Sequence, residues 1–140
     1  MDAANHLGEL RPIGSVSSPL EDRAAAPKQG DEGAPEATLE IDIRFQPALE
    51  GISAGDDLLV LTWLDRGSRE KLTVHPRDDE TRPATGVFAT RSPDRPNPIG
   101  LHRVKVVSVD GPTLRVEDLE AIDGTPILDL KPVLGEVGER

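Results

Sequence analysis

The sequence contains no cysteine and no tyrosine, and its only aromatic side chains are one tryptophan and two phenylalanines. The lack of cysteine excludes disulfides and thiolate metal sites. So few rings argue against a base-stacking platform of the kind that binds single-stranded nucleic acid. No apolar run is long enough to cross a membrane, and no basic-then-apolar leader opens the chain. We therefore expect a cytoplasmic protein without membrane contact.

The charge of the chain is strongly unbalanced toward acid. Asp and Glu number 26 against 16 Lys and Arg, which gives a formal net charge of −10 at pH 7. Such a charge repels nucleic-acid phosphates at long range. Four cations nevertheless stand close together, with Asp94 as the one acid in their stretch: Arg91, Arg95, Arg103 and Lys105. This local positive charge predicts a small anionic ligand rather than a long polyanion, and it leaves an RNA partner open.

Short apolar segments separated by glycine and proline predict an all-β protein. Apolar and polar residues alternate over 38–45, which is typical of a half-buried strand. A nearly continuous apolar run over 57–64 predicts a strand buried on both faces, and residues 47–52 predict one helical turn. Further strands are expected over 10–16, 86–89, 101–109, 113–119 and 127–130. The 140 residues suffice for one domain, a barrel or a sandwich with at most short helical turns.

The most distinctive stretch of the sequence runs from Thr90 to Leu101. It holds three prolines within six residues, and each proline fixes its own φ and disfavours helix at the preceding residue. Arg91, Arg95 and Asn97 stand among these prolines, so their side chains project from a stiff loop. Two interpretations remain open: a set of preorganised donors for an anionic or polar ligand, or a proline-rich connector with solvated arginines.

Several common catalytic machineries have no signature in this sequence. No G-x-G-x-x-G follows a strand into a helix, and no Walker A sequence is present. The histidines His6, His75 and His102 are far apart and show no H-E-x-x-H pattern. We therefore expect no metal site.

Two longer motifs resemble those of the TsaA/TrmO family. The first is Phe-Ala-Thr-Arg-Ser-Pro-Asp-Arg-Pro-Asn-Pro-Ile-Gly-Leu over 88–101, and the second is Asp-Gly-Thr-Pro-Ile-Leu-Asp-Leu-Lys-Pro over 123–132. The resemblance implies a small closed antiparallel β-barrel with long loops over 10–134, flanked by flexible tails at 1–9 and 135–140. It also implies S-adenosylmethionine as cofactor, a homodimer, and methyl transfer to N6 of threonylcarbamoyladenosine in tRNA.

The same resemblance assigns a cofactor site residue by residue. The segment 26–29 is similar to a Pro-Arg-Gln segment that lies against the cofactor in the family. Residues 117–120 fall on the strand end that borders the cofactor. Arg91, Asn97 and Glu120 are candidates for a catalytic role. The expected cofactor-binding residues are Gln29, Gly30, Asp65, Arg66, Arg91, Arg95, Asn97, Leu101, Glu117, Asp118, Leu119 and Glu120.

Three departures from the family pattern occur. Asp65 and Arg66 stand where members commonly carry a histidine, Glu120 replaces an aspartate, and Val133 replaces an aromatic residue. The lost ring and histidine change the shape and stacking of the pocket, so the departures bear on the methyl acceptor more than on the cofactor. Two alternatives to tRNA methylation therefore remain open: an S-adenosylmethionine-binding regulatory module without turnover, and a methyltransferase for a small-molecule acceptor.

Overall fold

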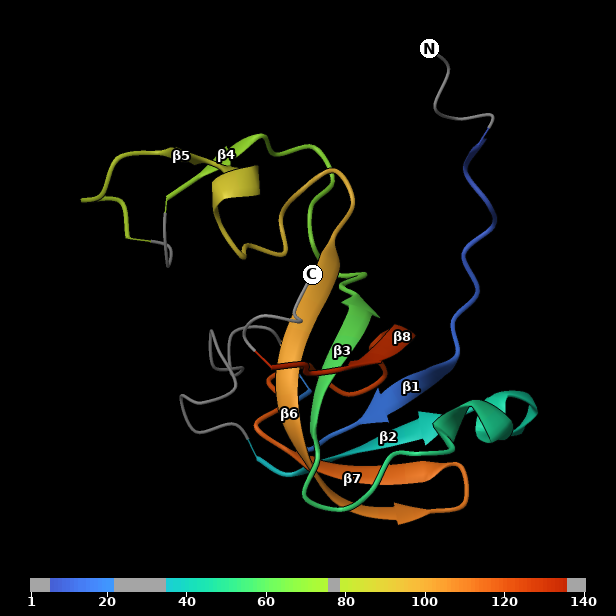
Figure 1. Ribbon diagram of the computed structural model, residues 1–140. Coiled ribbons are helices and arrows are strands. Elements are labelled where there is room, and N and C mark those ends of the chain that lie inside the picture. Colours follow the sequence, from blue (N-terminus) through green and yellow to red (C-terminus); the bar gives the residue numbers. More distant parts are fainter. Residues whose placement is uncertain (1–5, 22–34, 76–78, 136–140) are drawn as a thin grey trace.

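A computed structural model describes residues 6–21, 35–75 and 79–135 of the chain (Figure 1). Six strands close into an antiparallel barrel in the order β1-β2-β7-β6-β3-β8. This confirms the prediction of a small closed β-barrel with at most short helical turns. The barrel strands are β1 (Gly14–Ser17), β2 (Ala37–Ile41), β3 (Asp57–Trp63), β6 (Ile99–Asp110), β7 (Thr113–Glu117) and β8 (Pro126–Pro132).

Three smaller pieces lie outside the barrel sheet. A two-stranded sheet pairs β4 (Thr73–Val74) with β5 (Thr85–Gly86). Between residues 35 and 135, 3-10 turns are described as η3 (Ile43–Leu49) and η5 (Val87–Ala89). Within the described ranges, no helix has the length and apolar character to cross a membrane. The strands lie inside the predicted domain limits of 10–134, while those limits and the flexible tails stay predictions.

The core fills the barrel with aliphatic side chains. Along β6 the burial alternates strictly from Ile99 to Val106, so every second residue points inward. Branched aliphatic residues suit such a pleated, half-buried surface, which explains a stable core with so few aromatic rings. The most deeply buried core residues are Val16, Leu39, Val60, Val104, Val106, Leu114, Val116, Leu119 and Ile127.

The predicted strand over 38–45 was wrong at its end, because β2 stops at Ile41 and the chain turns into η3. Asp42 caps this segment: its Oδ1 accepts from the backbone N–H of Arg44 at 2.9 Å. Such a local side-chain bond offers the backbone an alternative to the sheet ladder. Ile43 consequently faces solvent, with 72% of its surface exposed.

Three other strand predictions need correction. β3 is buried on one face and only half-buried on the other, because it is a strand of a barrel, with one face on the core and the other on the outside. The predicted strand over 86–89 is β5 followed by the 3-10 turn η5. The first strand begins at Gly14 rather than Leu10, and Pro12 has no N–H to donate to a ladder.

The strand register brings three connections to one end of the barrel, which we call the mouth. The end of β3 pairs with the start of β6 (Trp63 with Ile99), and the end of β7 pairs with β6 at Lys105. The start of β8 pairs with β1 (Pro126 with Ser15). The β1–β2, β3–β6 and β7–β8 connections therefore leave the barrel together.

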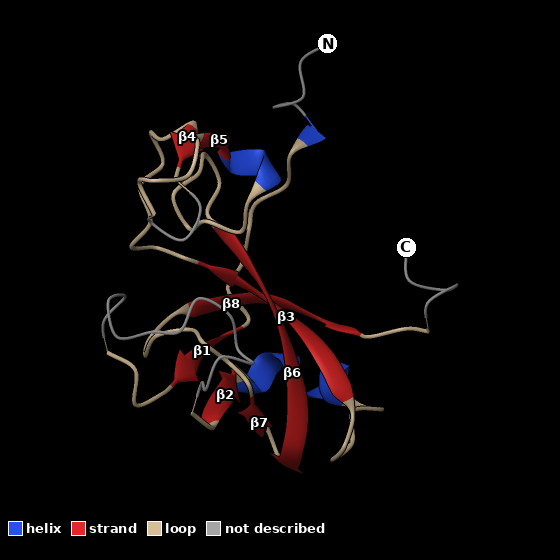
Figure 2. Cartoon of the chain, turned by 90° about the vertical axis from the view of Figure 1, so that its left-hand side faces the viewer, coloured by secondary structure: helices blue, strands red, loops and turns tan. Residues whose placement is uncertain are grey.

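The β3–β6 connection, residues 64–98, is the longest and forms a separate lobe. It contains β4, β5 and η5, which stand apart from the barrel strands in both views (Figures 1 and 2). Long ordered loops on a rigid scaffold commonly carry function.

Candidate functional site

The motif loop that follows η5 is braced by its own hydrogen bonds. Arg95 Nη1 donates to the carbonyls of Thr90 (2.9 Å) and Ser92 (3.0 Å). The Oγ1 of Thr90 accepts from the N–H of Ser92, and the Oγ of Ser92 accepts from the N–H of Asp94, both at 3.1 Å. The loop is therefore stiff, as its prolines predict, and the guanidinium of Arg95 already serves as one of its braces.

A second segment of the lobe clamps the motif loop from the side. Asp94 is buried, and its Oδ1 accepts from the N–H of Ser68 at 2.8 Å while Lys71 Nζ lies 3.6 Å from its Oδ2. In return, the carbonyl of Ser68 accepts from the N–H of Arg95 at 2.8 Å. Gly67 approaches Pro93 so closely that a β-carbon would lie 2.2 Å from the proline carbonyl oxygen. The two segments thus form one packed unit.

Arg69 fixes the far end of the motif loop, a role that the sequence did not reveal. Its Nε donates to the carbonyl of Pro96 at 2.7 Å, and its Nη2 donates to Oδ1 of Asn97 at 3.1 Å. Its guanidinium also stacks 5.3 Å from the centre of the Trp63 ring. Asn97, a predicted site residue, is held through this arginine.

Arg91 and Leu101 lie together on the outside of the barrel at the start of β6. Arg91 is exposed, and its Nη1 lies 3.5 Å from the carbonyl oxygen of Leu101. Leu101 is 42% exposed, because it sits at an outward position of the strand. These two predicted site residues are therefore accessible and adjacent.

The three connections at the mouth contact one another. In the lobe, Arg66 Nη1 donates to the carbonyl of Glu21 at 2.8 Å. In the β7–β8 connection, the N–H of Asp123 donates to the carbonyl of Leu20 at 2.6 Å, and its Oδ1 accepts from the N–H of Ser18 at 3.0 Å. The described start of the β1–β2 connection therefore joins the other two. Gln29 and Gly30 lie outside the described residues, and Asp65 is exposed beside Arg66.

The β7–β8 connection brings three carboxylates to the mouth. Glu117 ends β7, and Asp118 follows with a φ of 70°, a left-handed conformation that Asp tolerates better than most residues. Leu119 is fully buried in the core, so its predicted place beside the cofactor is also a packing position. Glu120 turns toward the barrel interior, where its Oε1 lies 2.5 Å from Nδ1 of His102.

His102 is a buried residue that the sequence interpretation left without a role. Only 4% of it is exposed, and its Nε2 lies 2.7 Å from Oγ1 of the fully buried Thr62. The signal was present, because His102 shares the inward face of β6 with Val104 and Val106. A histidine in such a row points into the core.

Two of the four cations that stand close together in the sequence are paired with an acid from another strand. Arg103 and Lys105 lie beside Asp57 on the neighbouring strand, at 3.4 Å and 3.3 Å. The hydrogen bond from Lys105, with a further one from Arg103, holds the pKa of Asp57 below its ordinary value. Strand pairing brings Asp57 opposite Lys105, which a linear reading of the motif cannot show.

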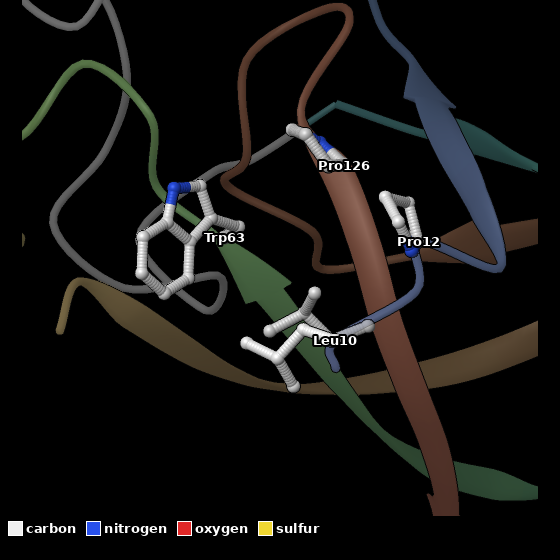
Figure 3. Close-up of a pocket in the computed structure, with 5 residues that line it drawn as sticks. Leu10, Pro12, Trp63 and Pro126 are labelled. Carbon is white, nitrogen blue, oxygen red and sulfur yellow. The ribbon is translucent and has the colours of Figure 1, made fainter. Parts of the chain in front are cut away.

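An apolar pocket lies on the outer wall of the barrel, where β3 ends and β8 begins. Figure 3 shows the ring of Trp63 beside Leu10, Pro12 and Pro126, and Leu128 completes the lining. Within the described ranges, no group of three or more His, Asp or Glu side chains is arranged to hold a metal ion.

The chain is similar in sequence to one protein family and to several named relatives. A family model described as the tRNA-methyltransferase O N-terminal domain matches residues 15–138. A probable S-adenosyl-L-methionine-binding protein of Archaeoglobus fulgidus is 44% identical over 126 residues, which are 90% of this chain and 34% of that protein. Another, from Methanothermobacter thermautotrophicus, is 39% identical over 128 residues, 91% of each chain.

Solved structures agree with these matches. Crystal structures of TrmO superpose with TM-scores of 0.76, at 30% identity, and of 0.74, at 29% identity, for the protein from Pseudomonas aeruginosa. Each superposition covers 94% of this chain but only 60% and 58% of the TrmO chains, so this chain is similar to part of each. The chain therefore belongs to the family defined by the N-terminal domain of tRNA-methyltransferase O.

Proposed function

We propose that the chain binds S-adenosylmethionine at the mouth of the barrel and uses it as a methyl donor. The observation that carries the proposal is the convergence of three connections at the mouth, two of which hold the family motifs of residues 88–101 and 123–132. Several relatives are named for binding this molecule. The structure describes ten of the twelve predicted binding residues, and all ten lie on these connections or on the strand ends beside them.

The chemistry of the mouth fits this ligand. S-adenosylmethionine supplies, when bound, a methyl group on a cationic sulfonium that is a good leaving group. The carboxylates of Glu117, Asp118 and Glu120 provide negative charge for a cation and acceptors for N–H groups. The exposed guanidinium of Arg91 offers donors for a carboxylate.

The residues of the chain have a limited chemical task. They must align the acceptor nitrogen with the methyl group, because holding two reacting groups close together in the right orientation raises the reaction rate greatly. They must also give the nitrogen a place to lose its proton, and a carboxylate of the 117–120 segment can accept it. Arg91, Asn97 and Glu120 are our candidates for this work, and no catalytic triad is required.

For the acceptor, we favour N6 of threonylcarbamoyladenosine in tRNA, which places the activity in the cytoplasm. The family description supports a tRNA substrate. We further propose a homodimer that covers the outer face of β6 at its start. Ile99 and Leu101 are 43% and 42% exposed there, beside Arg91 of the site. A second copy would remove this apolar surface from water and bring two sites near one interface.

A second candidate is an S-adenosylmethionine-binding module that does not methylate tRNA. It would act without turnover, or on a small-molecule acceptor. The net charge of −10 favours it, because long-range repulsion opposes a polyanionic substrate. The aliphatic Val133 and the acidic Asp65 at family positions for a ring and a histidine favour it as well.

Calorimetric titration with S-adenosylmethionine and S-adenosylhomocysteine tests the binding. We expect saturation near one site per chain and weaker binding in Arg91→Ala. The matched control is Arg44→Ala, which removes an exposed arginine from η3, away from the mouth. No binding by the unaltered protein at millimolar ligand would reject the proposal, and equal binding by both variants would remove Arg91 from the site.

Methyl transfer from labelled cofactor to tRNA that carries unmethylated threonylcarbamoyladenosine tests the acceptor. Label in that nucleoside supports tRNA methylation. Cofactor binding without transfer, together with no tRNA retention at low salt where attraction is strongest, would favour the second candidate.

A further inference from the structure

Three polar side chains from different elements form one hydrogen-bonded row inside the barrel. Thr62 on β3 bonds His102 on β6 (Oγ1 to Nε2, 2.7 Å), and His102 bonds Glu120 in the β7–β8 connection (Nδ1 to Oε1, 2.5 Å). Thr62 is fully buried and His102 is 4% exposed. The row therefore runs from the interior toward the mouth.

The fold does not require this row. Val60 precedes Thr62, and Val104 follows His102, on the same inward faces, and these neighbours fill the barrel with apolar groups. Hydrogen-bonded polar groups in a core contribute little net stability, and apolar replacements of similar shape for all partners are often neutral or stabilising. A row kept in place of apolar packing points to a role beyond stability.

The donors and acceptors fix the state of the imidazole. An ionised Glu120 can only accept, so Nδ1 of His102 carries the proton between them. In the described part of the chain, His102 is the one side chain that Thr62 Oγ1 bonds, so the hydroxyl has its single proton free to donate to Nε2. With this donation the ring carries one proton, on Nδ1, and it is held at both nitrogens.

Glu120 is the member of the row that reaches the mouth. Its side chain is 17% exposed, more than the other two. Oε1 is taken by His102, whereas Oε2 accepts no hydrogen bond from the residues that the structure describes. One carboxylate oxygen is thus anchored, and the other has no partner among the described residues and keeps some exposure to solvent.

We infer that His102 is a positioning residue for Glu120, and that Thr62 sets the tautomer with which it does so. Oε2 of Glu120 is thereby aimed at an N–H group of the bound ligand. This inference rests on the proposed binding of S-adenosylmethionine at the mouth, and it adds the specific contact and the two buried residues that prepare it.

Nitrogen-15 NMR of the histidine rings tests the buried part without any ligand. We expect His102, assigned by its loss in His102→Leu, to be neutral with the proton on Nδ1. A proton on Nε2, or a ring that exchanges freely between tautomers, would overturn the inference.

Calorimetry on variants tests the contact with the ligand. His102→Leu and Glu120→Gln should each weaken the binding of S-adenosylmethionine and S-adenosylhomocysteine alike, by about tenfold, the loss expected when one hydrogen bond to a charged group is removed. His102→Asn, which keeps a donor facing Glu120, should recover much of the affinity. His75→Leu is the control, because His75 is exposed in the lobe and bonds the carbonyl of Arg82.

The double variant separates positioning from packing. If His102 acts through Glu120, combining His102→Leu with Glu120→Gln should add little to the loss in either single variant. Additive losses, or His102→Leu binding as tightly as the unaltered protein, would overturn the inference. If His102→Leu does not fold, Thr62→Val and His102→Asn carry the same comparison.

The two levels of failure are distinguishable. If the unaltered protein binds no S-adenosylmethionine, the proposed function and the ligand contact fall together, while the NMR measurement still decides whether Thr62 and His102 orient Glu120. If the unaltered protein binds and the histidine variants bind equally well, the proposed function stands and the inference falls.

Discussion

Replacing Gly67 with alanine tests whether the packed unit of the lobe holds the motif loop in place. The added β-carbon would lie 2.2 Å from the carbonyl oxygen of Pro93 and 2.9 Å from its carbon. Ordinary contacts are about 3.5 Å, so the backbone of one segment must move by roughly 1 Å. Neither atom is the flexible end of a side chain, and the displacement passes directly to Asp94 and Arg95, which are hydrogen-bonded to Ser68.

The close contact sets the expected loss of stability and of reaction rate. Overpacking of this kind costs about 1–3 kcal/mol. For a domain of this size that lowers the thermal midpoint by about 3–10 °C. A shift of roughly 1 Å in a positioning loop can also lower a reaction rate by about a hundredfold. Methyl transfer should therefore fall further than stability alone explains.

The matched control is Gly86→Ala in the same lobe. Gly86 precedes η5 with a φ of −57°, and a β-carbon there meets no atom within 4 Å. Urea unfolding and transfer of labelled methyl should both be nearly unchanged in this control. If the two variants behave alike in both assays, the close approach of Gly67 to Pro93 does not hold the motif loop, and the reasoning is refuted.

Three further predictions concern the core, the barrel wall and the lobe. Leu39→Ala should destabilise the protein by about 2–5 kcal/mol, because Leu39 is fully buried in the barrel; a loss below about 1 kcal/mol in urea unfolding would show that the core collapses around the cavity. The pKa of Asp57 lies below its ordinary value of 3.8, so its ionised form contributes stability above pH 3.8 that is lost as the pH falls through the lowered pKa. The stability gap to Asp57→Asn should therefore shrink in acid, and a gap independent of pH would contradict this. Arg69→Lys should weaken ligand binding nearly as much as Arg69→Ala, because an ammonium cannot bond both Pro96 and Asn97 while it stacks on Trp63. Unchanged affinity of the lysine variant in calorimetry would contradict this prediction.

The sequence predicted best those features that local chemistry determines. The strand expected over 101–109 covers most of β6, whose residues alternate between the core and the solvent from Ile99 to Val106. Among the glycines that separate the apolar segments, Gly111 and Gly124 lie in turns with positive φ, at 59° and 83°, which glycine adopts readily. The closed barrel followed from the family resemblance, because short strands alone left a sandwich open.

The sequence could not predict contacts between distant segments. His102 is separated from Glu120 by 18 residues and from Thr62 by 40, so no local pattern connects them. The same holds for Asp57, which strand pairing sets opposite Lys105. The end of β2 at Ile41 is a different case. The apolar alternation of the sequence continues beyond Ile41, but the side chain of Asp42 accepts a hydrogen bond from the backbone N–H of Arg44 and the strand stops.

The lobe carries a charge balance unlike that of the rest of the chain, and this bears on the proposed tRNA acceptor. The sequence of 64–98 has seven Lys and Arg against six Asp and Glu, while the whole chain has a net charge of −10. A polyanion is therefore repelled least by the lobe. The exposed Arg91 and the exposed ring of Phe88, which lies over Arg95, face solvent on this part of the molecule. Salt at about 0.1 M screens charges that are more than about 10 Å apart, so it removes the long-range repulsion between the acidic barrel and tRNA as well as the attraction by the lobe. Moderate salt should therefore weaken the binding of tRNA to this chain less than it weakens the binding of tRNA to a basic protein.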